Sequence, residues 1–193
     1  MIRRHLGLAI AAACLGCALA PTIAHAQADY PSRPIRLVIP FPPGGGTDFV
    51  SRTVGTKLGE MTGWTIVLEN RPGAGGNLGA EITAKSPADG YTVLFTTNSM
   101  AVNVSLYPKL NYDPVKDFVP VALFATSPNL LLVHPTLPVG SVRELVALAR
   151  KRPGQLSFGS SGTGTSPYLA MELFKSLAGI DMTHVPYKGM APA

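Results

Sequence analysis

The sequence predicts an α/β fold in which short parallel strands alternate with amphipathic helices. Two observations support this prediction. Apolar runs rich in β-branched residues alternate with helical stretches over residues 35–95, and a glycine-rich turn follows the runs that end near residues 39 and 158. Such alternation is typical of parallel sheets, because the chain must cross over between two parallel strands and usually does so through a helix.

The first predicted strand covers residues 35–39, and the prolines that follow end it because proline cannot donate a hydrogen bond to a sheet. The helix predicted next has Thr47 or Asp48 as its N-cap and Gly63 as its stop. Its apolar face comprises Val50, Val54, Leu58 and Met61. The turn 42–48 therefore joins a strand to the N-terminus of a helix.

Two more strands are predicted at residues 64–68 and 91–95, with a short helix that begins near Asn77 between them. In open parallel sheets, ligands bind beyond the carboxyl ends of the strands. We therefore expect three loops to meet at one edge of the sheet: 42–48, 70–77 and 96–99.

A polar stretch with prolines at 107–114 interrupts the alternation, as a passage between domains would. Strands are predicted after it at 119–125 and 130–133. Ser141 and Glu144 then form a capping box, which predicts a helix that runs to Lys151.

The turn 159–167 repeats the arrangement of the turn 42–48. A short strand at 156–158 precedes it, and a helix follows with Ser166 as the predicted cap and Pro167 as its first residue. Glycines bring backbone N–H groups close to a ligand, and a helix N-terminus adds unpaired donors and a positive dipole end. One such turn also fits a purely structural role, but the pair predicts a cleft that holds a carboxylate or phosphate.

The first 26 residues have the features of an export signal that is cleaved after Ala26. Two arginines precede an uncharged apolar stretch, and Ala24–Ala26 has the small residues of a signal-peptidase site. The stretch is short and broken by Pro21, so a retained membrane helix is less favoured, and a lipoprotein attached through Cys17 is the other alternative. Cleavage removes both cysteines, which excludes catalysis by a thiol and zinc–thiolate sites.

The sequence offers no candidate catalytic residues. The turn 159–163 lacks the second glycine of a nucleophile elbow, because Thr163 stands at that position. His134 and His184 have no carboxylate near them in sequence, so we interpret both as structural or surface histidines. The acidic residues are scattered, so we predict no metal site and no cofactor.

Nucleic acids and nucleotides are not expected as partners. The net charge of +5 is spread along the chain without a basic cluster that alternates with aromatic residues. No Gly-Lys-Ser/Thr sequence follows the turn 42–48, and the turn lacks the spaced glycines of a dinucleotide fingerprint. Nucleotides are thus not favoured as ligands, and a carboxylate and a phosphate both stay open at this point.

Six segments in order resemble the tripartite tricarboxylate transporter receptors, also called Bug-type periplasmic solute-binding proteins. They are YPSRPI, PPGGGTD, ENRPGAGGN, PADGYT, FGSSGTG and HVPYKG, at residues 30–35, 42–48, 69–77, 87–92, 158–164 and 184–189. Together they span nearly the whole chain after residue 27.

The resemblance implies a two-lobed, type II periplasmic-binding-protein-like fold in which each lobe is a mostly parallel sheet flanked by helices. The first lobe would cover 27–115 and the second 116–193. Relatives continue further, so the resemblance also implies that the second lobe is incomplete here and that the chain alone binds its solute poorly or not at all. Apolar residues of the last helix would then stay partly uncovered, namely Leu173, Phe174 and Leu177.

The resemblance further implies a monomeric periplasmic receptor, not an enzyme, that passes a di- or tricarboxylate, an acidic amino acid or an aromatic acid to a membrane permease. A receptor that signals to a membrane sensor is the alternative, and a hydrolase-like enzyme is less favoured. The implied ligand-binding residues are Gly44, Gly45, Gly46, Thr47 and Asp48 on one side, Ser160, Ser161, Gly162, Thr163 and Thr165 on the other, Tyr168 beside the second turn, and Thr97 and Ser99 at the floor. Asp48 would either cap its helix or orient a bound water.

Overall fold

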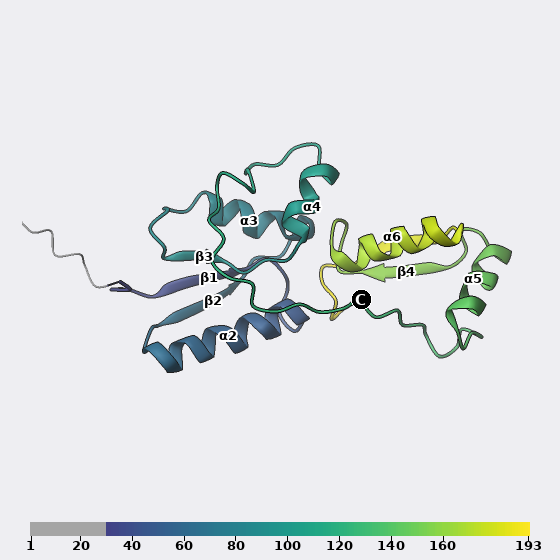
Figure 1. Cartoon of the computed structure of the whole chain (residues 1–193), viewed down its shortest axis with the longest axis horizontal. Helices are drawn as coiled ribbons and strands as arrows, with labels where there is room; N and C mark the ends of the chain where they lie inside the picture. Colours follow the sequence, from purple (N-terminus) through teal and green to yellow (C-terminus); the bar gives the residue numbers. More distant parts are fainter. Residues whose placement is uncertain (1–29) are drawn as a thin grey trace, which may run out of the picture. The chain divides into compact units, whose positions relative to one another are not determined.

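The computed structural model describes residues 30–193, and the predicted export signal and its cleavage site lie outside the described residues. The chain divides into a unit of residues 1–32 and a unit of residues 33–193, and the description below concerns the second (Figure 1). Within the described part of the chain, none of the helices combines the length and the hydropathy that a membrane crossing requires.

The first sheet has three parallel strands in the order β2-β1-β3. They are β1 (Ile35–Ile39), β2 (Ile66–Asn70) and β3 (Thr92–Leu94). Strand β1 lies in the middle, with Leu37 opposite Leu68 on one side and Val93 on the other. Its position explains its apolar sequence, since a central parallel strand is covered on both faces. The predicted parallel α/β arrangement is therefore confirmed.

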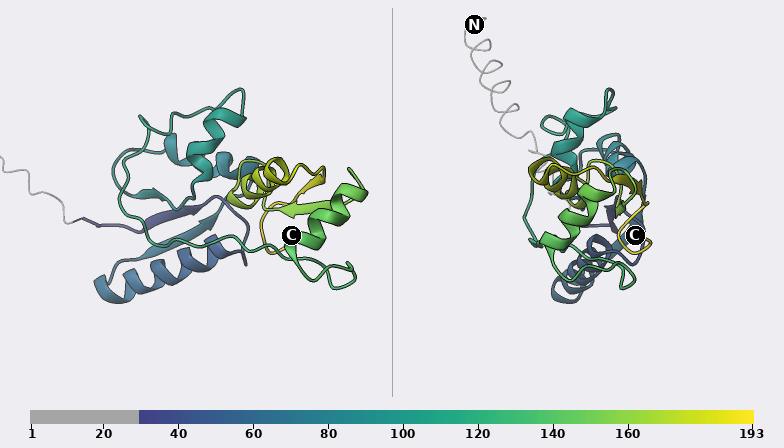
Figure 2. Two further views of the ribbon diagram at one scale, coloured as in Figure 1. Left: turned by 45° about the vertical axis from the view of Figure 1, so that its right-hand side comes forward. Right: turned by 90° about the vertical axis from the view of Figure 1, so that its right-hand side faces the viewer.

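Helices cover both faces of this sheet. Helix α2 (Gly46–Thr62) lies on one side, and α3 (Asn77–Ala84) and α4 (Ser99–Leu106) lie on the other (Figures 1 and 2). A short 3-10 turn, η2 (Ala74–Gly76), leads directly into α3. Helix α4 was not expected from the sequence, because its apolar and polar residues do not segregate into two faces.

Helix α2 ends at the residue that the sequence predicts, but it does not begin there. Gly63 adopts a left-handed conformation with φ of 74° and its N–H binds Gly59 O, as predicted for the stop. The predicted N-cap was wrong, because Gly45 occupies that position and both Thr47 and Asp48 lie inside the first turn. The Asp48 carboxylate instead accepts a hydrogen bond from the N–H of Gly44, outside the helix.

The second sheet pairs β4 (Ser157–Ser160) with β5 (Thr183–Pro186) in parallel. Helices α5 (Val142–Lys151) and α6 (Ser166–Ala178) pack beside it (Figure 2). A core forms between them from Ala149, Phe158, Ile180 and Met182. One half of the predicted capping box is present, since Ser141 Oγ accepts from Glu144 N at 3.2 Å. The Glu144 carboxylate accepts from Gly140 N instead of Ser141 N.

The strands predicted at 119–125 and 130–133 are absent. Residues 118–134 form no helix or strand, and Val119 and Leu132 are 87% and 82% exposed. A strand needs a neighbouring strand to complete its backbone hydrogen bonds. None of the described strands pairs with this segment, so its apolar sequence alone does not make it a strand.

The predicted exposure on α6 is found for two of its three apolar residues. Leu173 and Leu177 are 60% and 79% exposed. Phe174 instead packs against the core between α5 and α6. The helix is therefore anchored by one edge of its apolar face.

We predict that Ser141→Ala destabilises the chain by about 1 kcal/mol, the usual cost of losing an N-cap side chain. The loss arises because the N–H of Glu144 no longer has its side-chain acceptor. Urea denaturation followed by circular dichroism measures the change. Ser176→Ala is the matched control, because Ser176 is an exposed residue inside α6 and caps nothing. Equal stability of the two variants would contradict the capping role.

Candidate functional site

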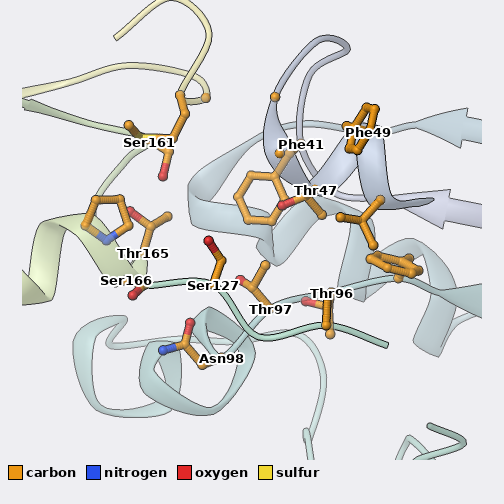
Figure 3. A pocket seen from close by; sticks show the side chains of 18 of the residues that line it. Phe41, Thr47, Phe49, Thr96, Thr97, Asn98, Ser127, Ser161, Thr165 and Ser166 are labelled. Atoms are coloured by element: carbon orange, nitrogen blue, oxygen red, sulfur yellow. The ribbon is translucent and has the colours of Figure 1, made fainter. Parts of the chain in front are cut away.

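A cavity of about 670 Å³ opens at the carboxyl ends of β1 and β3 and at the start of α6 (Figure 3). Five stretches of chain form it: the turn before α2, the loop after β3, residues 122–129, the start of α6 and residues 189–192. Two of the three loops that the sequence placed at this edge, 42–48 and 96–99, contribute to the lining, whereas 70–77 does not.

The N-termini of three helices meet at this cavity. Its lining includes Gly45 to Thr47 at the start of α2, Thr97 and Asn98 at the start of α4, and Thr165 to Pro167 at the start of α6. The N-cap residues are Gly45, Asn98 and Thr165, and none of them caps its helix with a side chain. All three ends are positive dipole ends. At α4 the N–H groups of Ser99 and Met100 already bond to Thr97, and Pro167 of α6 has no N–H, so the open amide donors lie mainly at the start of α2.

The polar groups in the lining are neutral. Among the described residues that form the cavity, none is charged. Figure 3 shows the hydroxyl groups of Thr47, Ser127 and Ser161 directed toward a common space. Backbone amides and hydroxyl groups at helix N-termini suit an anion, because they donate hydrogen bonds without bringing a counter-charge.

Asp48 faces away from this cavity. Its carboxylate accepts hydrogen bonds from Gly44 N, Arg52 Nε and Asn70 Nδ2 at 2.9, 2.9 and 2.8 Å, and the residue is 4% exposed. Burial raises the pKa of Asp48, but these hydrogen bonds and the Arg52 charge lower it more, so the pKa lies below its ordinary value. Asp48 therefore holds the turn in place, and the N–H of Gly44 is already engaged.

The structure brings six of the predicted site residues together in the cavity lining: Gly45, Gly46, Thr47, Thr97, Ser161 and Thr165. Thr165 Oγ1 donates to Gly162 O at 2.6 Å, and Thr97 Oγ1 lies 2.9 Å from Ser99 Oγ. These two hydroxyl groups therefore also stabilise their own turns.

The remaining predicted residues lie elsewhere. Ser99 is buried at 1% exposure beside Thr97. Gly162 and Thr163 line a second cavity of about 240 Å³ together with the loop 73–76. Gly44 and Asp48 border a shallow groove along α2, and Tyr168 packs against the ring of His184 with ring centroids 4.7 Å apart.

Ser160 and His184 form a pair that the sequence did not reveal. Ser160 Oγ lies 2.7 Å from His184 Nε2, and the imidazole stacks on Phe158. Burial lowers the pKa of His184, with a smaller opposing effect of Glu172. Ser160 is fully buried, so its hydroxyl cannot reach a substrate. The pair links β4 to β5, which agrees with a structural histidine.

Aromatic residues in the lining were also missed. Phe41, Phe95 and Phe124 contribute to the cavity, and the rings of Phe95 and Phe124 stack with centroids 5.4 Å apart. Phe124 belongs to a segment predicted as a strand, and an apolar residue there fits a sheet core equally well. Nothing in the local sequence distinguishes a cavity wall from a core residue.

Asn103 connects the loop before α3 to the loop before α6. Its Nδ2 donates to Asn77 Oδ1 at 2.7 Å and to Gly75 O at 3.2 Å. Its Oδ1 is buried without a hydrogen-bond partner among the described residues. Gly164, with φ of +84°, lies against this oxygen, and a Cβ at Gly164 would overlap it. A residue with a side chain therefore does not fit at position 164.

Comparison with known proteins identifies the family. A family model described as the tripartite tricarboxylate transporter family receptor matches residues 50–193. The chain belongs to this family. The family predicted from the six segments is therefore confirmed, and its description is that of a receptor, in agreement with the prediction that the chain is not an enzyme.

Individual members show the same relationship. The chain is 41% identical to the protein BugT of Bordetella pertussis over 85% of its own length and 51% of that protein. A solved R. palustris protein with adipate is 44% identical, with a TM-score of 0.81 over 85% of this chain and 55% of the other. MatC from Rhodopseudomonas palustris with bound malate is 36% identical, with a TM-score of 0.76 over 84% and 56%.

These similarities confirm the predicted fold class. The chain spans about half the length of the curated relatives that it matches.

We predict that the stability of the chain falls as the pH drops below about 4, partly because Asp48 becomes protonated. A lowered pKa in the folded state means that Asp48 stabilises the fold above its unfolded pKa of about 3.9, and that this contribution is lost as the pH falls through the folded value. Asp48→Asn should cost about 1–3 kcal/mol at pH 7 and progressively less at acidic pH.

Urea denaturation between pH 7 and pH 3 measures this difference. Asp181→Asn is the control, because Asp181 is exposed. A pH-independent difference between the original chain and Asp48→Asn would show that the carboxylate charge does not hold the turn.

We predict that Gly164→Ala is more destabilising than Gly179→Ala. Both glycines have positive φ, at +84° and +60°, so an alanine is strained at either position, by about 1–2 kcal/mol. Only the Cβ at position 164 meets another group, Asn103 Oδ1, whereas a Cβ at position 179 has open space. Overlap in a packed site adds about 1–3 kcal/mol. Equal thermal shifts for the two variants would contradict the close contact with Asn103.

Proposed function

We propose that this chain is part of an exported receptor that captures a small carboxylate in the cavity and delivers it to a tripartite tricarboxylate-type membrane transporter. The observation on which this proposal rests is the meeting of three helix N-termini, without a charged side chain, at one cavity of about 670 Å³. The adipate and malate present in two related structures agree with a carboxylate ligand.

The proposed contacts follow from the cavity lining. The amides of Gly45, Gly46 and Thr47 and the hydroxyl groups of Thr47 and Ser161 would donate to the carboxylate oxygens. Thr97 and Thr165 would complete the polar surface. The other predicted residues would support these turns from behind: Gly44, Asp48, Ser99, Ser160, Gly162, Thr163 and Tyr168.

The wider assignments rest on family membership. We propose that the mature receptor begins after Ala26, resides in the periplasm and acts as a monomer that meets membrane permease subunits transiently. The lobe boundary near residue 115 also remains a proposal, supported by the placement of β1 to β3 before it and of β4 and β5 after it. A receptor that signals to a membrane sensor would use the same cavity and differ in its partner.

The proposal predicts that the chain binds dicarboxylates in preference to the corresponding diamides. Adipate and adipamide have similar shapes, but only adipate accepts charge-assisted hydrogen bonds, so we expect a preference of at least about tenfold. The resemblance implies that the chain alone binds its solute poorly or not at all, so we expect weak binding at most, and the measurement must detect millimolar affinities at about −4 kcal/mol. Saturation-transfer NMR with the purified chain detects binding at this level.

Two variants make the experiment specific. Thr47→Val removes a hydroxyl group from the lining and should weaken adipate binding about three- to tenfold. Ser176→Ala, on the exposed side of α6, should leave binding unchanged. Stronger binding of a phosphate or a sugar than of any carboxylate, by a chain with a native circular dichroism spectrum, would refute the proposed function.

A further inference from the structure

We infer that His184 positions the second turn of the candidate site, residues 160–165, by accepting a hydrogen bond from Ser160, and that protonation of its ring loosens this turn. The hydrogen bonds involved lie within residues 158–187, so the switch itself does not depend on the identity of the solute. Its consequence for binding rests on the proposed function, because Ser161 and Thr165 of this turn line the cavity.

The hydroxyl group of Ser160 connects the turn to the histidine. Its oxygen accepts from Gly162 N at 3.1 Å, and it lies 2.7 Å from His184 Nε2 and 3.3 Å from Gly162 O. Ser160 is fully buried, so water does not replace any of these partners. Because a hydroxyl group has one hydrogen, Ser160 donates either to the imidazole or to the carbonyl.

The geometry favours donation to the imidazole. Gly162 O is the more distant acceptor, and it already accepts from Thr165 Oγ1 at 2.6 Å and from Thr165 N at 3.3 Å. A carbonyl oxygen has two lone pairs, so a third donor would compete with these two. The hydrogen-bond partners therefore assign the tautomer in which Nε2 of His184 is bare and Nδ1 carries the hydrogen.

The surroundings of the ring favour its neutral form. The imidazole stacks on Phe158 of β4 and lies against Tyr168 of α6, with ring centroids 4.9 and 4.7 Å apart. Burial lowers the pKa of His184, Glu172 on α6 raises it by a smaller amount, and Lys175 on the same helix lowers it. Glu172 and Lys175 are paired at 3.1 Å, so their charges offset each other at the ring. Strand β4 contains no charged residue.

Protonation of the ring reverses the hydrogen bond. The Nε2–H of an imidazolium is a donor, so Ser160 Oγ would have to accept from it as well as from Gly162 N. The hydroxyl hydrogen would then be left with Gly162 O, whose lone pairs Thr165 already uses. A buried donor without an acceptor is unfavourable, so the turn relaxes until one of these bonds breaks. The positions of Ser161 and Thr165 therefore depend on a neutral His184.

The direction of the pH effect follows from the lowered pKa of His184. Below its ordinary value of about 6.5, the unfolded chain binds a proton that the folded chain does not. Stability is therefore lost as the pH falls from about 6.5 through the lower pKa of the folded state. This range lies above the acidic range in which Asp48 titrates, so the two effects can be measured separately.

Nitrogen-15 NMR of the purified chain, without any solute, tests the inference. We expect a bare Nε2 and a protonated Nδ1 on His184 at pH 7.5. Between pH 7.5 and pH 5, the amide signals of Gly162 and Thr165 should shift with the same midpoint as the ring. An Nε2-protonated neutral tautomer, or amide signals of the turn that do not follow the ring, would overturn the inference. This measurement needs no variant.

Two variants of His184 separate the hydrogen bond from the packing. His184→Gln keeps an acceptor near the position of Nε2 but does not titrate, so the amide signals of the turn should lose their pH dependence. His184→Phe keeps the stacking on Phe158 without an acceptor, so the turn should be loosened at every pH. His134→Gln is the control, because His134 is exposed and bonds to Thr136 in its own loop. An unperturbed turn in His184→Phe would contradict the positioning role.

Adipate binding connects the switch to the cavity. From pH 7.5 to pH 5, the original chain should lose about two- to tenfold more affinity than His184→Gln, the effect of one hydrogen bond. The comparison with the variant removes the titration of adipate itself. Equal losses would overturn the link between the turn and binding. Failure of every carboxylate to bind would overturn the proposed function and leave the NMR result on His184 and its turn standing.

Discussion

The structure around the cavity depends on the hydrogen bonds to one carboxylate, that of Asp48. This group binds the turn through Gly44 N, its own helix through Arg52 and the end of β2 through Asn70. Asn70 also donates to Phe41 O, so the turn is fixed at both of its ends. Because Asp48 reaches backwards instead of capping α2, the first amides of the helix stay available at the cavity. The negative charge of Asp48 is paired with Arg52 outside the cavity, so Asp48 adds no charge to the cavity lining.

Much of the fold could be predicted because its determinants are local. Ser141 caps α5 by accepting from Glu144 N within one helical turn, and Gly63 ends α2 by a left-handed conformation that glycine adopts readily. The segment 118–134 shows the limit of such reasoning. Its apolar residues satisfy the sequence pattern of a strand, but a strand also needs a partner, and partners are set by parts of the chain distant in sequence.

For the candidate site too, the sequence predicted some features and missed others. Glycine-rich turns before helices mark where donors lie, and Gly45, Gly46, Thr47, Ser161 and Thr165 do lie together in one cavity. The direction in which each side chain of a turn points was not predictable. Adjacent hydroxyl groups face opposite ways in the second turn, since Ser161 lines the cavity and Ser160 binds His184 behind it. The contact of Asn103 with Gly164 joins residues 61 positions apart, so no local pattern signals it.

A neutral cavity surrounded by helix ends has a consequence for release as well as capture. A lysine or arginine paired with a buried carboxylate can hold it strongly, and separating such a pair leaves an uncompensated charge in each partner. Helix N-termini supply partial charges that are fixed in the backbone and return to water at little cost when the solute leaves.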